Sequence, residues 1–175
     1  MPNYHRWHHD GGTYFFTADL QDRRQTLLTE HIDRLRTAIQ KVKSKRPFSI
    51  VAAVVLPEHL HMIWELPARD PDYSTRWRLI KSAFSIGLPT AERRSASVTK
   101  KGEKGIWQRR FYEHTLRDPK DLNQHVDYIH FNPVKHGHAK RPAEWPYSSI
   151  HRHIREGKRT ADWGTANPPH DLDRD

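Results

Sequence analysis

The alternation of apolar and polar residues predicts four strands along the chain. Residues 12–20 are aromatic and β-branched, and residues 48–56 form a nearly continuous apolar run. Residues 59–66 alternate strictly, as a strand with one face in a core does. A fourth strand is expected over residues 106–116, where aromatic and β-branched residues return.

Apolar residues three and four positions apart predict the helices. The first lies between Asp22, which resembles the start of a capping box, and Pro47. A second is expected over residues 74–86. A third begins with Asp118-Pro119, a strong start signal, and should stop at Asn132-Pro133.

Two further segments complete this pattern. Residues 90–105 are charged and small, which predicts a mobile basic loop and no folded element. A short basic helix is expected over residues 148–156.

This order of elements predicts an α+β domain with a ferredoxin-like antiparallel sheet. The early helices should cover one face of the sheet, and an added C-terminal helix carries Tyr128. The even-numbered residues of segment 59–66 are all apolar and should face the early helices, so His59 and His61 should share the opposite face. The length suits a single domain, and the Pro-rich, polar end from Thr165 onward should be loose.

Composition narrows the function classes. The formal net charge is +9, and a domain this basic usually binds a polyanion, although solubility alone can also explain such a charge. The chain has no cysteine, which excludes disulfides, thiolate zinc sites and cysteine nucleophiles. No apolar run approaches the roughly 20 residues of a membrane span, and the first residues lack the apolar centre of a secretory signal. We therefore expect no membrane contact and a cytoplasmic, nucleoid-associated protein.

Two groups of residues could carry chemistry together. His59 and His61 project from one face of a strand, close enough to share a cation. Tyr128 and Asn132 are four residues apart and share one face of the third helix. Two imidazoles and an amide oxygen can hold a divalent ion, which would leave the phenol to act as nucleophile. The alternatives are two surface histidines, a packed tyrosine and an asparagine that caps a helix.

Basic and aromatic residues suggest how a nucleic acid would bind. Cations follow phosphates, and aromatic faces stack unpaired bases. The alternative is an ordinary strand with its aromatic residues in the core and its arginines in water. The expected DNA-binding residues are Arg76, Arg78, Lys81, Lys100, Lys101, Trp107, Arg109, Arg110, Lys135 and His136.

Four motifs, in order and at family-like spacing, resemble those of the REP-associated tyrosine transposases. They are Leu56–Trp64, Trp107–His114, Tyr128–Gly137 and Trp145–Ser149. These proteins belong to the HUH (His-hydrophobic-His) superfamily of single-tyrosine transposases. The resemblance covers roughly residues 1–163, which implies a single domain over this range and a polar, flexible tail at 164–175. His138 is a departure, since an aliphatic residue is expected after Gly137.

The resemblance implies a set of roles. His59 and His61 match the metal-binding pair, Asn132 the position of a third ligand, and Tyr128 the nucleophile. Such enzymes cut single-stranded DNA at hairpins formed by repetitive extragenic palindromes (REP), using Mg²⁺ or Mn²⁺, and leave a 5′-phosphotyrosine and a free 3′-hydroxyl. The sequence leaves open the choice between a monomer and a dimer.

Two other functions fit part of the pattern. A non-catalytic module that binds single-stranded nucleic acid would use the same charge and aromatic residues, but it needs neither paired histidines nor Tyr128. A zinc hydrolase would need a third ligand near the histidines, and Glu65 lies on the same predicted face.

Overall fold

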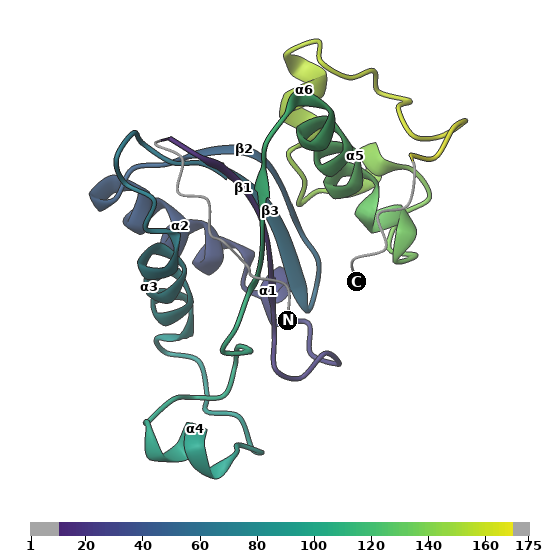
Figure 1. Ribbon diagram of the computed structural model, residues 1–175. Coiled ribbons are helices and arrows are strands. Elements are labelled where there is room, and N and C mark those ends of the chain that lie inside the picture. Colours follow the sequence, from purple (N-terminus) through teal and green to yellow (C-terminus); the bar gives the residue numbers. More distant parts are fainter. Residues whose placement is uncertain (1–10, 170–175) are drawn as a thin grey trace, which may run out of the picture.

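A four-stranded antiparallel sheet organises the chain, and helices cover both of its faces (Figure 1). Its strands are β1 (Thr13–Asp19), β2 (Ser49–Val55), β3 (His59–Glu65) and β4 (Tyr112–Leu116), in the order β2-β3-β1-β4. This order, with every neighbouring pair antiparallel, confirms the ferredoxin-like α+β class. The computed structural model describes residues 11–169. The expectations for the first ten residues and for the end of the tail lie outside this range.

The helices divide between the two faces of the sheet. The group on one face contains α1 (Leu27–Glu30), α2 (Ile32–Lys45) and α3 (Tyr73–Ser85), while α5 (Pro119–Lys135) covers the other (Figure 1). The chain then continues through η1 (Pro142–Glu144) to α6 (Ile150–Arg155), and α4 (Ala96–Lys100) lies away from the sheet. Within the described residues, no helix has the length and apolar character needed to cross a membrane.

The apolar alternation of β3 separates two cores. Leu60, Met62 and Trp64 pack against α2 and α3, and Trp64 stacks on Trp77 with ring centroids 4.5 Å apart. Burial of such aromatic area is a main stabilising contribution to the fold. The opposite face carries a smaller core around Phe15 and α5. Because the even-numbered residues of β3 fill the first core, its two histidines point toward α5, as expected.

The segment at residues 145–149 covers the outer edge of β2. The main-chain N–H of Val55 donates to the carbonyl of Tyr147 (2.9 Å), and that of Ser149 donates to Ala53 (2.8 Å). The indole of Trp145 donates to the carbonyl of Val55 (2.9 Å). The last family-like motif therefore protects an edge strand that would otherwise offer unpaired main-chain groups.

A polar cluster fixes the C-terminal region to α5. His130 Nδ1 accepts a hydrogen bond from Arg159 Nε (2.9 Å), so its Nε2 carries the proton and donates to Ser149 Oγ (2.9 Å). Burial, together with the charge of Arg159, lowers the pKa of His130 to about 2. This histidine is neutral and already accepts at Nδ1. The Ser149–His130 pair is therefore structural and does not form a nucleophile–base pair.

Two predicted elements before residue 106 differ from the structure. The first helix starts at Leu27 and not after Asp22, because Asp22 binds the main-chain N–H and the guanidinium of Arg24. The region 90–105 is also not a bare loop. It contains α4, whose first turn is capped by Ser95, and its base is closed by a hydrogen bond from Ala91 to Lys104 (2.8 Å).

Two further predictions differ from residue 106 onward. The strand expected over 106–116 begins only at Tyr112, and Trp107 forms just an isolated bridge with Leu20. The helix expected to stop at Pro133 continues to Lys135. Proline removes one hydrogen bond inside a helix, but α5 resumes at once, since the carbonyl of Asn132 accepts from the N–H of His136 (3.0 Å).

Candidate active site

His59 and His61 lie side by side on the face of β3 that α5 covers. Their ring centroids are 4.9 Å apart, and the residues are 1 % and 0 % exposed. Two buried imidazoles this close need partners that compensate for the loss of water. Each ring has such a partner on its Nδ1, and the partner of His59 also defines which nitrogen of that ring carries the proton.

Glu58 orients the first of these rings. The Nδ1 of His59 lies 2.8 Å from Glu58 Oε1, and a carboxylate can only accept, so Nδ1 carries the proton. Burial acts to raise the pKa of Glu58, but the hydrogen bond from His59, together with the charge of Arg23, outweighs it and lowers that pKa. In the neutral ring Nε2 is then a bare acceptor. It is buried and has no hydrogen-bond partner among residues 11–169.

Thr17 holds the second ring from the neighbouring strand. Thr17 of β1 is paired with His61 of β3, and its Oγ1 lies 2.7 Å from His61 Nδ1. Metal-binding histidines usually have such a partner on the second ring nitrogen, which orients the ring and sets its tautomer. The buried, unpartnered Nε2 of His59 beside a second fixed imidazole therefore fits a divalent cation.

The helix α5 brings Tyr128 over this pair. Asp118 accepts a hydrogen bond from the N–H of Asp121 (2.8 Å) and starts the helix where the sequence predicted. The Tyr128 ring centroid lies 5.1 Å from that of His61, and Tyr128 is only 3 % exposed. Asn132 is fully buried one turn further along the same helix. The four residues predicted as catalytic or metal-binding thus lie on facing surfaces of β3 and α5.

The end of α5 places two more polar side chains at this site. Gly137 has a φ of 74°, a left-handed conformation that suits glycine. The N–H of Gly137 donates to Val134 (3.0 Å), and that of His138 donates to Pro133 (2.8 Å). This turn leaves Lys135 with its Nζ 5.1 Å from the Tyr128 ring centroid.

His136 belongs to the same turn. Its ring centroid is 5.0 Å from that of His59, so this residue lies next to the histidine pair, where the sequence predicted only a DNA contact. His138, the one departure from the family pattern, packs against Trp145 with ring centroids 5.3 Å apart. The substitution is therefore accommodated in local packing.

Arg76 is a correction to the predicted DNA-binding set. The residue is fully buried, and its guanidinium binds both carboxylate oxygens of Asp70, at 2.7 and 3.2 Å. It also donates to the carbonyls of Arg46, Pro47 and Asp72. Arg76 therefore joins α3 to the turn before β2 and has no surface to offer a phosphate.

Four other members of the set line one cavity on the α3 side of the sheet. They are Arg78, Lys81, Trp107 and Arg109, and the cavity has a volume of about 660 Å³. The Lys81 ammonium donates to the carbonyl of Gln108 (2.9 Å) and lies 5.8 Å from the Trp107 ring centroid. Burial lowers the pKa of Lys81 to about 8, partly offset by the charge of Asp19.

The remaining predicted contacts do not converge on a single site. Lys100 and Lys101 are exposed at the end of α4, and Arg110 is exposed before β4. At the rim of the cavity described above, Arg109 Nε pairs with Glu103 Oε2 at 3.2 Å. The structure thus separates a histidine–tyrosine site under α5 from a basic and aromatic surface on the α3 side.

Sequence reasoning missed the two side chains that orient the histidines. Glu58 precedes His59 directly, so a carboxylate next to the pair was a usable signal. Thr17 gave no such signal, because only the pairing of β1 with β3 brings it to His61.

Comparisons with known proteins agree with this geometry. The family model for IS200-like transposases matches residues 12–132. The REP-associated tyrosine transposase of Escherichia coli K12 is 48 % identical over 163 residues, covering 93 % of this chain and 91 % of that protein. The chain belongs to the REP-associated tyrosine transposases. It is therefore an enzyme of the HUH type.

Other relatives of this family extend the likeness over nearly the whole chain. A REP-associated tyrosine transposase assigned in Haemophilus influenzae is 44 % identical over 169 residues, covering 96 % of each chain. A solved structure of a REP-associated tyrosine transposase bound to a REP hairpin superposes with a TM-score of 0.80. It shares 45 % sequence identity, and the match covers 98 % of this chain and 99 % of that one.

Proposed function

We propose that this transposase is a metal-dependent endonuclease and strand transferase for single-stranded DNA at hairpins, with Tyr128 as its nucleophile. The observation that carries the proposal is the position of the Tyr128 ring, 5.1 Å from the ring of His61. A non-catalytic binding module has no need for a phenol next to two oriented, buried imidazoles. A zinc hydrolase would need a further ligand, and Glu65 is exposed at the end of β3.

The reaction follows from the nucleophile. The Tyr128 oxygen attacks the phosphorus of a phosphodiester, and a new phosphorus–oxygen bond forms while the bond to the 3′-oxygen breaks. The phenol loses its proton and the departing 3′-oxygen gains one, which leaves a 5′-phosphotyrosine and a free 3′-hydroxyl. When another 3′-hydroxyl attacks the phosphotyrosine, a new phosphodiester bond forms, the bond to the Tyr128 oxygen breaks and the phenol regains its proton. The strand is then joined to a new 3′-end.

The surrounding side chains divide the remaining tasks. His59, His61 and Asn132 would hold Mg²⁺ or Mn²⁺, which when bound polarises the phosphodiester and neutralises developing charge. The Lys135 ammonium, 5.1 Å from the ring centroid, would compensate the charge of the phenolate. Because Tyr128 is 3 % exposed, the site must open before the phenol reaches DNA.

The DNA would extend from this site onto the basic surface. The solved relative binds a REP hairpin, and we propose a hairpin-forming palindromic DNA as the partner here. Arg78, Lys81, Trp107 and Arg109 would bind unpaired nucleotides in the α3-side cavity. Lys135 and His136 would act next to the scissile phosphate, and Lys100, Lys101 and Arg110 would contact the backbone. A cytoplasmic, nucleoid-associated location follows from this substrate.

A cleavage assay with end-labelled hairpin DNA and Mg²⁺ or Mn²⁺ tests the proposal. His61→Ala should abolish cleavage and keep most of the DNA binding, because the imidazole holds the metal and not the DNA. His31→Ala, on the opposite side of the sheet, is the matched control and should cut normally. Normal cleavage by His61→Ala would refute the metal assignment, and tight binding without cleavage by the wild type would favour the binding module.

A further inference from the structure

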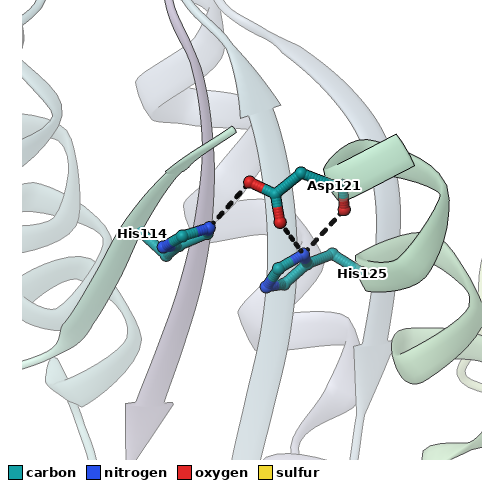
Figure 2. Close-up of side chains that lie close together, drawn as sticks. All are labelled: His114, Asp121 and His125. Carbon is teal, nitrogen blue, oxygen red and sulfur yellow. Dashed lines mark hydrogen bonds and ion pairs between the residues drawn. The ribbon is translucent and has the colours of Figure 1, made fainter. Parts of the chain in front are cut away.

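Three side chains outside the histidine pair converge where the start of α5 meets β4 (Figure 2). His114 comes from β4, and Asp121 and His125 come from α5. His114 Nε2 lies 2.8 Å from Asp121 Oδ2, and His125 Nδ1 lies 3.1 Å from Asp121 Oδ1. The carboxylate of Asp121 thus lies between two imidazoles, and each imidazole contacts a different carboxylate oxygen.

This cluster is separate from the site under Tyr128. The ring of Phe15 lies between them, with centroid distances of 4.9 Å to His125 and 5.5 Å to His61. Phe15 is paired with His114 across the sheet, whereas His61 is paired with Thr17. The two groups therefore occupy different positions on one face of the sheet, with an apolar ring between them.

The donor set of the cluster is that of a transition-metal site. Two imidazole nitrogens and a carboxylate oxygen all lie within 4.8 Å of one another. His125 is buried, while the side chains of His114 and Asp121 are 30 % and 24 % exposed, which gives an ion a route from solvent. Imidazole-rich sites favour Zn²⁺ and its neighbours over Mg²⁺, which prefers oxygen ligands.

We propose that His114, Asp121 and His125 form a second divalent-cation site, which prefers Zn²⁺ or Co²⁺ to Mg²⁺. His125 Nδ1 donates to the main-chain carbonyl of Asp121 (2.8 Å), so in the metal-free state it carries the proton. To bind a cation through Nδ1, His125 moves that proton to Nε2. His114, whose Nε2 faces Asp121, moves its proton from Nε2 to Nδ1 and binds the cation through Nε2. No proton leaves the protein, and hydrogen bonds to Asp121 are exchanged for bonds to the ion.

Such an ion would join β4 to the helix that carries the nucleophile. Tyr128 follows His125 by three residues, so both lie on one side of α5. An ion bound to His114 and His125 would fix the distance of this part of the helix from the sheet. The inference does not depend on the chemistry proposed for Tyr128.

The test is a count of bound Co²⁺ or Zn²⁺ on the full chain by equilibrium dialysis, with the Co²⁺ visible spectrum as a second readout. Asp121→Asn should bind one cation fewer than the wild type, or should bind the same number with one of them held at least about tenfold more weakly. His114→Ala should show the same loss, which guards against a variant that folds poorly. His138→Ala, an exposed histidine of the α5 turn, is the control and should keep every ion.

Removing the other histidine pair distinguishes the two sites. The double variant His59→Ala, His61→Ala should lose one cation and keep the ion held by Asp121, and excess Mg²⁺ should not displace it. If Asp121→Asn and His114→Ala bind as many ions as tightly as the wild type, the second site does not exist. If the double variant loses no ion, His59 and His61 do not form a metal site. The ion count for Asp121→Asn then still decides whether the site of His114, Asp121 and His125 exists.

Discussion

Replacing Gly137 by alanine tests whether the end of α5 sets the geometry of the active site. Gly137 has a φ of 74°, and an added Cβ would meet no atom within 4 Å, so the cost is backbone strain alone. Strain in the left-handed region is about 1–2 kcal/mol, and the less flexible unfolded chain offsets part of it. We expect the free energy of unfolding to fall by about 1 kcal/mol, which for a chain of this size lowers Tm by roughly 2–4 °C.

The same substitution should also slow cleavage. Unwinding the last turn of α5 relieves the strain but moves Lys135 away from the Tyr128 ring and His136 away from His59. A displacement of about 1 Å in an active site can reduce the rate by roughly 100-fold, so we expect at least about a tenfold loss. Urea unfolding measures the first effect, and single-turnover cleavage of a labelled hairpin measures the second.

A matched glycine separates strain from geometry. Gly157, just after α6, has a φ of 72° and also has no atom within 4 Å of an added Cβ. Gly157→Ala should therefore lose similar stability and cut DNA at the wild-type rate. Equal cleavage by the two variants would refute the reasoning that the turn at Gly137 positions catalytic side chains.

Four further substitutions test single contacts. Arg76→Ala should lower the free energy of unfolding by roughly 2–3 kcal/mol, because buried carbonyls lose their donor, whereas Arg78→Ala should keep stability and reduce the salt slope of DNA binding by about one. Urea unfolding and salt titrations show whether the two arginines differ. Lys81 has a pKa of about 8 against 10.5 in the unfolded chain, so its charge, and with it hairpin affinity, should fall as pH rises from 7 to 8.5. Because the buried ammonium of Lys81 destabilises the folded protein, the free energy of unfolding should rise with pH between 8 and 10.5, where only the folded chain has lost this proton. Lys81→Arg should remove both the pH dependence of affinity and that of stability. Thr17→Val should weaken Mn²⁺ binding by about 10–100-fold, since His61 loses the partner that orients it; unchanged affinity in a Mn²⁺ titration would remove Thr17 from the site.

The sequence predicted the fold and the positions of the candidate site residues wherever one residue pattern determined both the element and the direction of its side chains. In β3 the apolar residues Leu60, Met62 and Trp64 have to enter a core, so His59 and His61 can only point the other way. The helical spacing of Tyr128 to Asn132 likewise placed both on one face. These predictions needed no knowledge of which strands are neighbours.

The predictions that were wrong concern residues whose structure depends on contacts distant in the sequence, or segments in which two local sequence preferences oppose each other. Arg76 looks like any helical arginine until the fold brings the carbonyls of the turn before β2 around it. Pro133 should end a helix, yet the turn closed by Gly137 supplies enough hydrogen bonds for α5 to continue. The segment before Tyr112 has strand-like residues, but its main-chain pairing is confined to residues 106–108, which form one isolated bridge between Trp107 and Leu20.

Covalent capture of DNA tests the role of Tyr128 as nucleophile most directly. Wild-type protein, Tyr128→Phe and Tyr112→Phe would be mixed with labelled hairpin DNA and Mn²⁺ and analysed under denaturing conditions. Tyr112 is a fair control because it is 46 % exposed and lies near Phe15, with ring centroids 6.2 Å apart. If Tyr128 is the nucleophile, a metal-dependent protein–DNA adduct forms with the wild type and with Tyr112→Phe but not with Tyr128→Phe. An adduct that survives in Tyr128→Phe would contradict this role of Tyr128.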